Sequence, residues 1–190
     1  MKDFTIDLER CLEVLHSGGI ILYPTDTVWG LGCDATNDSA VKKLNQLKGK
    51  PDQKGLFVLL ATERDVLQYV ASPDMELFDF LEKQKRPTTV IYNDGLNVAN
   101  EVLNNDGSIA IRLVYEDFCR HLIKRFRKPI VATSANFHGE PTPQNFNQVN
   151  PQLLQLVDYT VKFRQEDVGT ASASSIIKWN GHGKFTVIRN

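Results

Sequence analysis

The sequence predicts a single α/β domain, residues 1–190, with a twisted, mixed, open sheet of parallel and antiparallel strands flanked by helices. Helical and strand patterns alternate early in the chain and strands cluster late, which is typical of a mixed sheet. No repeat, low-complexity tract or obvious linker divides the chain. Its 190 residues, 42% of them hydrophobic, are enough to bury one complete core.

The first helix is expected over residues 8–16, where "LERCLEVLH" places its apolar side chains on one face and Gly18-Gly19 ends the pattern. A second helix is expected to begin at an N-cap formed by Asp38 or Ser39. It ends at "LKGKP", where a lysine in the last turn is followed by a glycine and a proline.

Strands are expected where apolar runs are bounded by turn residues. Helical periodicity marks three more segments, 63–70, 74–84 and 115–126, and the last of these turns its phenylalanines, leucine and isoleucine inward. The expected strands are 20–23, 28–32, 55–61, 88–92, 108–114, 129–135, 157–163, 174–179 and 185–189.

Composition excludes several classes of protein. A net charge of −1 argues against a protein whose whole surface binds nucleic acid. A local basic patch is still compatible with this charge. Three widely spaced cysteines without a C-x-x-C pair predict free thiols in a reducing, cytoplasmic setting. No segment approaches the ~18 apolar residues of a membrane span. The four histidines show no metal-ligand spacing, so no metal site is expected.

The segment "GLGCDA", residues 30–35, matches the G-x-G-x-x-G/A pattern of dinucleotide-binding folds. In those folds the helix begins at the glycines, so that its N-terminus meets the pyrophosphate. Here the first candidate N-cap follows Gly32 by six or seven residues, and we interpret the match as accidental. The sequence also has no G-x-x-x-x-G-K-[ST] segment, which excludes a P-loop.

The segment "YPTDT" ends the first strand. Pro24 has no N–H for the ladder, so Thr25, Asp26 and Thr27 lie at the carboxyl end of a strand, where open α/β sheets place ligands. The same side chains could bond their own backbone in a turn. The spacing leaves both interpretations open.

Two lysines, Lys48 and Lys50, flank Gly49 at the end of the second helix. They could complement the carbonyl end of the helix dipole, or they could hold phosphate oxygens as point charges.

A second polar segment, "ATSAN", follows the apolar strand near residue 131. Thr133, Ser134 and Asn136 offer hydroxyl and amide groups, although Asn136 could instead begin a turn. Arg112 interrupts the apolar strand "IAIRLV" and needs a partner, either a carboxylate of this chain or an anionic substrate. No Ser-His-Asp or Cys-His arrangement stands out.

Together, "GGIILYPTDTVWGLGCDA", "LKGKPDQKGLFVLL", "IAIRLV", "PIVATSAN" and "SSIIK" resemble the YrdC-like family of threonylcarbamoyl-AMP synthases, over almost the whole chain. The resemblance implies a concave, positively lined cavity. It also implies a nucleotidyltransferase that makes threonylcarbamoyl-AMP and pyrophosphate from L-threonine, bicarbonate and ATP, with Mg²⁺ carried by the ATP phosphates. The product serves tRNA threonylcarbamoyladenosine modification by downstream proteins, and some members are described as binding tRNA or double-stranded RNA. No membrane partner is implied.

The resemblance also implies site residues. Lys48 and Lys50 match the family's K-x-R pair, and Ser134 and Asn136 match its S-x-N pair, all four in the catalytic centre. Thr25, Arg112 and Thr133 would hold threonine. The nucleotide would be held by Lys48, Lys50, Thr89, Ser134, Ser174 and Arg189.

Three departures from the family pattern favour a divergent member. Lys50 replaces the arginine of K-x-R, so a point charge stands where the family has a bidentate donor. The usual W-P-G-P-x-T segment keeps only Pro87 and Thr89, and Val114 replaces a proline. A paralogue acting on another carbamoyl substrate therefore stays open.

A rival interpretation is an RNA-binding protein without synthase activity. It rests on basic residues that could equally form a solvated helix face: Arg112, Arg120, Lys124, Arg125, Arg127 and Lys128.

Overall fold

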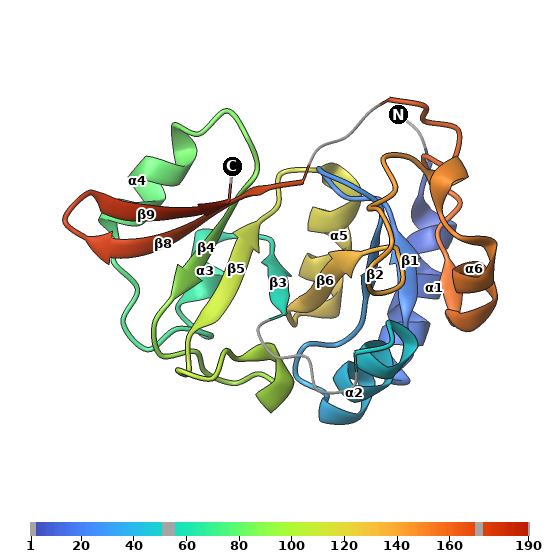
Figure 1. The fold of residues 1–190 in the computed structure, drawn as a ribbon, viewed down its shortest axis with the longest axis horizontal. Helices are drawn as coiled ribbons and strands as arrows, with labels where there is room; N and C mark the ends of the chain where they lie inside the picture. Colours follow the sequence, from blue (N-terminus) through green and yellow to red (C-terminus); the bar gives the residue numbers. More distant parts are fainter. Residues whose placement is uncertain (1–2, 51–55, 170–172, 190) are drawn as a thin grey trace.

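The computed structural model describes residues 3–50, 56–169 and 173–189 (Figure 1). Its elements in chain order are α1 (Thr5–His16), β1 (Ile21–Tyr23), β2 (Gly30–Gly32), α2 (Asp38–Leu47), β3 (Phe57–Leu60), α3 (Glu63–Val66), α4 (Glu76–Glu82), β4 (Thr88–Tyr92), η1 (Asn100–Val102), β5 (Ile109–Leu113), α5 (Asp117–Phe126), β6 (Ile130–Ser134), η2 (Phe146–Gln148), α6 (Pro151–Leu156), β7 (Tyr159–Thr160), β8 (Ser175–Gly181) and β9 (Lys184–Arg189).

The strands of the described residues form one nine-stranded sheet in the order β7-β1-β2-β6-β3-β5-β4-β8-β9. Three pairs are parallel, β1 with β7, β3 with β5 and β4 with β8, and the other neighbours are antiparallel. The predicted mixed, open sheet is confirmed. Since consecutive elements often lie apart in this order, segments distant in the sequence meet at the centre of the sheet.

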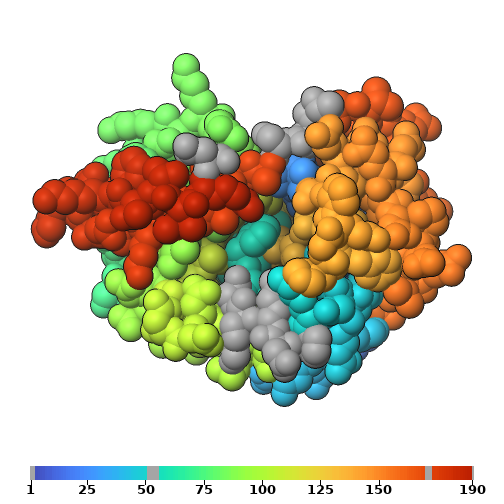
Figure 2. Space-filling view, in the orientation of Figure 1, coloured from blue at the N-terminus to red at the C-terminus, as the bar shows by residue number. Residues whose placement is uncertain are grey.

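Helices α1 and α5 pack on each other and contact β1 and β3 respectively, behind the central strands in Figure 1. Helix α4 lies at the other end, against β8 of the terminal hairpin. Figure 2 shows a hollow in the visible face, between the β8–β9 hairpin and the segment near residues 135–150. No helix among the described residues is long and apolar enough to span a membrane.

Two predicted helix ends need correction. Helix α1 begins at Thr5, three residues before the predicted start, with Asp3 Oδ1 accepting from the Thr5 N–H at 2.9 Å. Helix α2 is capped by Asn37, not by Asp38 or Ser39, because the Asn37 side chain accepts from the backbone N–H of Ala40 at 3.1 Å. The last turn of α2 carries no basic residue, and Lys48 is its C-cap.

The predicted strand over 157–163 is reduced to β7. Asp7 of α1 accepts hydrogen bonds from the backbone N–H groups of Lys162 and Phe163, at 2.9 and 2.8 Å, and from the Tyr159 hydroxyl. The N–H groups that would extend the strand are therefore taken by a side chain. The helical segments 63–70 and 74–84 shorten to α3 and α4, and part of the predicted strand 55–61 lies outside the described residues.

Helix α6 was missed by the sequence analysis, although its start carries a signal. Asn150 accepts from the Gln152 N–H at 3.0 Å, and Pro151 occupies the first helical position, where its missing N–H costs nothing.

The glycines of "GLG" form β2, between β1 and β6, and helix α2 begins well after them. A Cβ on Gly32 would lie 2.7 Å from both Tyr23 Cε1 and the Val131 carbonyl oxygen. Glycine is therefore required for close packing of three strands. The interpretation of the dinucleotide match as accidental is confirmed.

Replacing Gly32 by alanine is expected to lower the free energy of unfolding by about 2–3 kcal/mol, because the neighbours are a packed ring and a backbone carbonyl that have no room to move. Gly169→Ala is the control, since its Cβ would meet nothing within 4 Å. Urea unfolding of both variants makes the measurement. Equal midpoints would contradict the packing argument.

Candidate functional site

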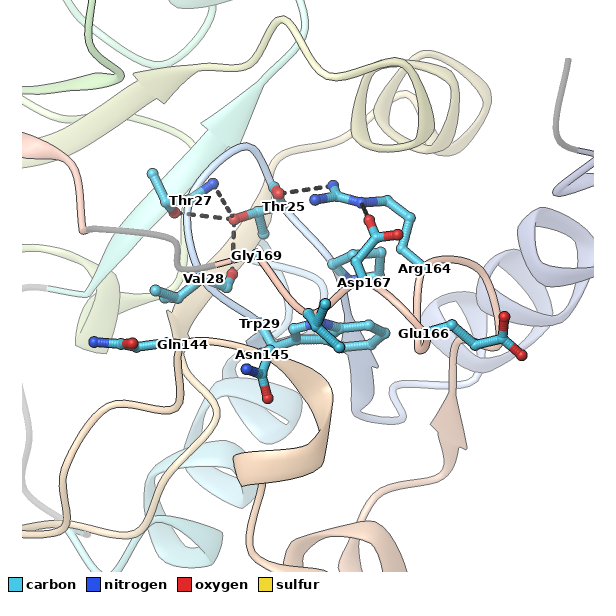
Figure 3. Close-up of a pocket in the computed structure, with 12 residues that line it drawn as sticks. Thr25, Thr27, Val28, Trp29, Gln144, Asn145, Arg164, Glu166, Asp167 and Gly169 are labelled. Atoms are coloured by element: carbon cyan, nitrogen blue, oxygen red, sulfur yellow. Dashed lines mark hydrogen bonds and ion pairs between the residues drawn. The ribbon is translucent and has the colours of Figure 1, made fainter.

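The turn after β1 is built from its own hydroxyl groups. The Thr25 hydroxyl donates to the Val28 carbonyl at 2.8 Å and accepts from the Thr27 N–H at 3.0 Å. It also lies 3.0 Å from the Thr27 hydroxyl (Figure 3). The turn interpretation of "PTDT" is thus confirmed, and the turn still lies at the carboxyl end of β1.

Arg112 on β5 is 2% exposed and reaches this turn. Its Nη2 lies 3.0 Å from Asp26 Oδ1, its Nη1 donates to the Thr27 hydroxyl at 3.0 Å, and its guanidinium lies 5.3 Å from the centroid of the Phe57 ring. The expected carboxylate partner of Arg112 within this chain is therefore present, and it is Asp26. Burial raises the pKa of Asp26, and the charge of Arg112 opposes that shift.

Lys48 does not bond the carbonyl end of its own helix through its side chain. Its Nζ donates to the Ser134 carbonyl at 2.6 Å, and the His138 N–H donates to the Lys48 carbonyl at 3.0 Å. Burial and the neighbouring charge of Lys50 lower the pKa of Lys48 to about 8. The end of α2 and the loop after β6 are therefore bonded side by side.

Asn136 forms the predicted turn. Its Nδ2 donates to the carbonyls of Phe137 and Glu140, at 3.1 and 2.8 Å. Its Oδ1 is buried and has no hydrogen-bond partner among the described residues. A donor from a ligand would satisfy that oxygen, since a buried acceptor without a partner is costly.

Thr89, Ser174 and Arg189 form a third group, at the junction of β4, β8 and β9. The hydroxyls of Thr89 and Ser174 lie 2.8 Å apart and are both buried. Arg189 donates through Nε and Nη2 to the Ser174 carbonyl, at 3.2 and 2.9 Å.

Some of the predicted site residues line a cavity of about 200 Å³, whereas Thr25, Lys48, Lys50, Thr89 and Asn136 are not among the described residues that line it. Its lining includes five residues predicted for the site: Arg112, Thr133, Ser134, Ser174 and Arg189. Lys48 reaches it through Ser134, and Thr89 through Ser174.

A second cavity, of about 470 Å³, adjoins the first at Thr27 and Val28 (Figure 3). Thr25 and Trp29 line it on one side, with segments 144–145 and 164–169 on the others. The hydroxyl-lined turn therefore stands between two cavities.

Three residues of this region were missed as site residues. Asp26 carried a signal, because it stands inside "YPTDT". Trp29 reads as an ordinary core aromatic, and Arg164 carried no sequence signal. Arg164 donates to the Thr25 carbonyl at 3.0 Å and to Asp167 at 2.8 Å, and so fixes the segment after β7 over the turn.

Basic side chains line the cavity of about 200 Å³ or lie near it. Arg189 lines it, Lys48 bonds one of its walls, and Lys50 follows two residues later, while the charge of Arg112 is paired with Asp26. Such a site is suited to an anion. Among the described residues there is no group of three or more His, Cys, Asp or Glu side chains that could hold a metal ion.

Comparisons with known proteins identify the family of the chain. A family model described as "Sua5_yciO_yrdC: Telomere recombination" matches residues 13–190. A protein of Stenotrophomonas maltophilia named threonylcarbamoyl-AMP synthase is 33% identical over 161 residues, which cover 83% of this chain and 86% of the relative. A protein of the same name from Photobacterium profundum is 35% identical, over 77% of this chain and 81% of its own.

Solved structures share the fold. Sua5 of P. abyssi, complexed with L-threonine, has a TM-score of 0.83 at 20% identity. The match covers all of this chain and 55% of the Sua5 chain, so this chain spans about half of that protein. YciO of E. coli has a TM-score of 0.79 at 18% identity, over 97% of this chain and 89% of its own.

Thr89→Val is expected to lower the free energy of unfolding by about 1–2 kcal/mol, because it leaves the buried Ser174 hydroxyl without its partner. Thr88→Val on the same strand is the control, since that hydroxyl bonds the Arg86 carbonyl at an exposed position. Urea midpoints report both. A larger loss in the control would contradict the assignment of the Thr89–Ser174 pair.

Proposed function

Because the chain belongs to the Sua5/YciO/YrdC family, we propose that it is a threonylcarbamoyl-AMP synthase. As a nucleotidyltransferase it would convert L-threonine, bicarbonate and ATP into threonylcarbamoyl-AMP and pyrophosphate. Relatives of that name at 33–35% identity support the proposal, as does the threonine complex of a protein with the same fold.

One observation carries the proposal. Arg112, Ser134 and Arg189, which lie far apart in the sequence, line one cavity beside the Thr25–Thr27 turn. Lys48 donates to the Ser134 carbonyl. A cationic cavity next to a hydroxyl-lined turn can hold the phosphates of a nucleotide next to a small hydroxy amino acid.

The chemistry needs no nucleophile from the protein. The amine of threonine and bicarbonate form a carbamate and release water. A carbamate oxygen then attacks the α-phosphorus of ATP, and the bond to the β-phosphate oxygen breaks to release pyrophosphate. The protein supplies position and charge neutralisation.

Each group has a proposed role in this reaction. Lys48 and Lys50 neutralise the phosphates, while Ser134 and Asn136 hold the reacting groups beside them. Thr25, Thr133 and Arg112 hold threonine on the side of the turn. The nucleoside part lies toward Thr89, Ser174 and Arg189. Mg²⁺ would enter on the ATP phosphates, since the described residues offer no cage of acidic ligands.

The basic residues on which the RNA-binding interpretation rests do not all lie in the same surroundings. Arg112 is buried on β5 and pairs with Asp26, and Lys128 pairs with Asp34 at 2.7 Å. The remaining basic side chains belong to α5 and the residue that ends it. We therefore favour the synthase.

The proposal is tested by measuring pyrophosphate released from ATP, with threonine and bicarbonate omitted in turn. Turnover that requires both supports the synthase. Turnover that does not change without threonine would overturn it, and salt-dependent RNA binding without turnover would favour the rival function.

Lys50 gives a residue-level prediction. Lys50→Ala is expected to lower kcat/KM at least about 10-fold, or about 1.4 kcal/mol, because a cation beside the phosphates is lost. Lys50→Arg is expected to keep or raise activity, since a guanidinium adds a bidentate donor. Steady-state kinetics with ATP compare the two. An unchanged Lys50→Ala enzyme would remove this residue from the site.

A pH dependence follows from Lys48. Its pKa is lowered to about 8, so the charged form is present below that pH, and kcat/KM for ATP should fall as pH rises through about 8. Lys48→Arg should abolish this fall, because a guanidinium stays charged.

Lys50→Ala should move the alkaline fall to higher pH, because Lys50 is one cause of the lowered pKa of Lys48. A pH–rate profile from pH 6 to 10 measures all three proteins. An alkaline fall that stays in place in both variants would exclude Lys48 as its source.

A further inference from the structure

The deepest charged side chain near the site is Arg112, and its nearest countercharge belongs to Asp26. The side chains are 2% and 13% exposed, and the atoms Nη2 and Oδ1 lie 3.0 Å apart. A guanidinium at this depth needs a carboxylate, because an unpaired buried charge strongly destabilises a protein. The pair joins the turn after β1 to the middle of β5.

Three contacts define the orientation of the guanidinium. Asp26 Oδ1 forms an ion pair with Nη2, the Thr27 hydroxyl accepts a hydrogen bond from Nη1, and the guanidinium carbon lies 5.3 Å from the centroid of the Phe57 ring. Thr27 is held in turn by Thr25, which lines the neighbouring cavity (Figure 3). The guanidinium therefore cannot rotate without breaking an ion pair and a hydrogen bond.

Of the three guanidinium nitrogens of Arg112, one has neither an ion pair nor a hydrogen bond among the described residues. Its Nε–H is buried and has no partner among the described residues, while Arg112 lines the cavity of about 200 Å³. A buried donor of a charged group without an acceptor is costly, and an anionic oxygen in that cavity would satisfy it.

We propose that Asp26 is a positioning residue, which fixes the Arg112 guanidinium so that its free Nε–H meets the carboxylate of the amino-acid substrate. The inference rests on the proposed function for the identity of that substrate. Asp26 does not touch the reacting atoms. Because the substrate carboxylate is not changed in the reaction, its contact with Arg112 contributes equally to ground-state and transition-state binding, and its loss should raise KM without lowering kcat.

A third cavity, of about 220 Å³, offers space for the longer side chain of a conservative variant, Asp26→Glu. Its lining includes Asp26, Leu113 and Tyr115, and also the basic residues Lys85 and Arg86. The additional methylene of a glutamate at this position can enter that space, and its carboxylate can still reach Arg112. A glutamate is thus expected to restore the function that an amide loses.

The test compares Asp26→Asn with Asp26→Glu in the full chain, by pyrophosphate release at varied threonine and at varied ATP. Asp26→Asn should raise KM for threonine at least about 10-fold, with kcat and KM for ATP within about 3-fold of the unmodified protein. Asp26→Glu should keep KM for threonine within about 3-fold. If Asp26→Asn does not fold, a 10-fold higher KM for threonine in Asp26→Glu overturns the inference.

Asp34→Asn is the control, because it weakens the ion pair of another buried carboxylate, Asp34, with Lys128, whose side chain is 44% exposed. Neither residue lines either of the two adjoining cavities. This control should lower the unfolding midpoint and leave KM for threonine unchanged. A purely structural role of Asp26 would give the same pattern in Asp26→Asn, which would overturn the inference.

Threonine-dependent turnover of the unmodified protein distinguishes failure of the inference from failure of the proposed function. Threonine-dependent turnover in that protein, with an unchanged KM for threonine in Asp26→Asn, overturns only the positioning role. Absence of threonine-dependent turnover in the unmodified protein overturns the function itself. Unfolding midpoints of Asp26→Asn and Asp34→Asn then show whether Asp26 stabilises the turn.

Discussion

The buried contact between Arg112 and the turn after β1 is the constraint on which the site depends. In the sheet order, β1 and β2 are separated from β5 by β6 and β3, so the guanidinium bridges strands that do not pair. Asp26 and Thr27 both hold it, at 3.0 Å each. The charge in the middle of an apolar strand is stable only because the turn brings a carboxylate to it. The position of the turn, and of both cavities beside it, follows from that pairing.

A second constraint is the close approach of β1, β2 and β6. Gly32 has no Cβ, and the Tyr23 ring and the Val131 carbonyl occupy the space where one would stand. This packing brings the end of β6, with Ser134, to the turn on β1. The glycines serve the site indirectly, by allowing the strands that carry its side chains to lie together.

The electrostatics of the site result from burial acting on a few cations. The charge of Arg112 is balanced by Asp26, whereas the buried Lys48 has a backbone carbonyl as its acceptor among the described residues and has a pKa lowered to about 8. Arg189 likewise donates to a carbonyl, that of Ser174. Cations that are held by neutral groups keep their charge available to an anion, which suits a site for phosphates better than a set of closed ion pairs would.

The sequence by itself determined the type and order of most elements, though not α6, and it singled out most of the polar residues that line the cavity of about 200 Å³. The run "TTVIY" predicted β4 at its observed bounds, and the amphipathic pattern predicted α5, because a buried face imposes a local period. Only the tertiary structure decided which alternatives hold. Asp26 pairs with Arg112, Lys48 reaches Ser134 rather than its own helix end, and Asp7 shortens β7. Each of these contacts joins residues more than 80 positions apart, and no local period or spacing records which distant partner a charged side chain will meet.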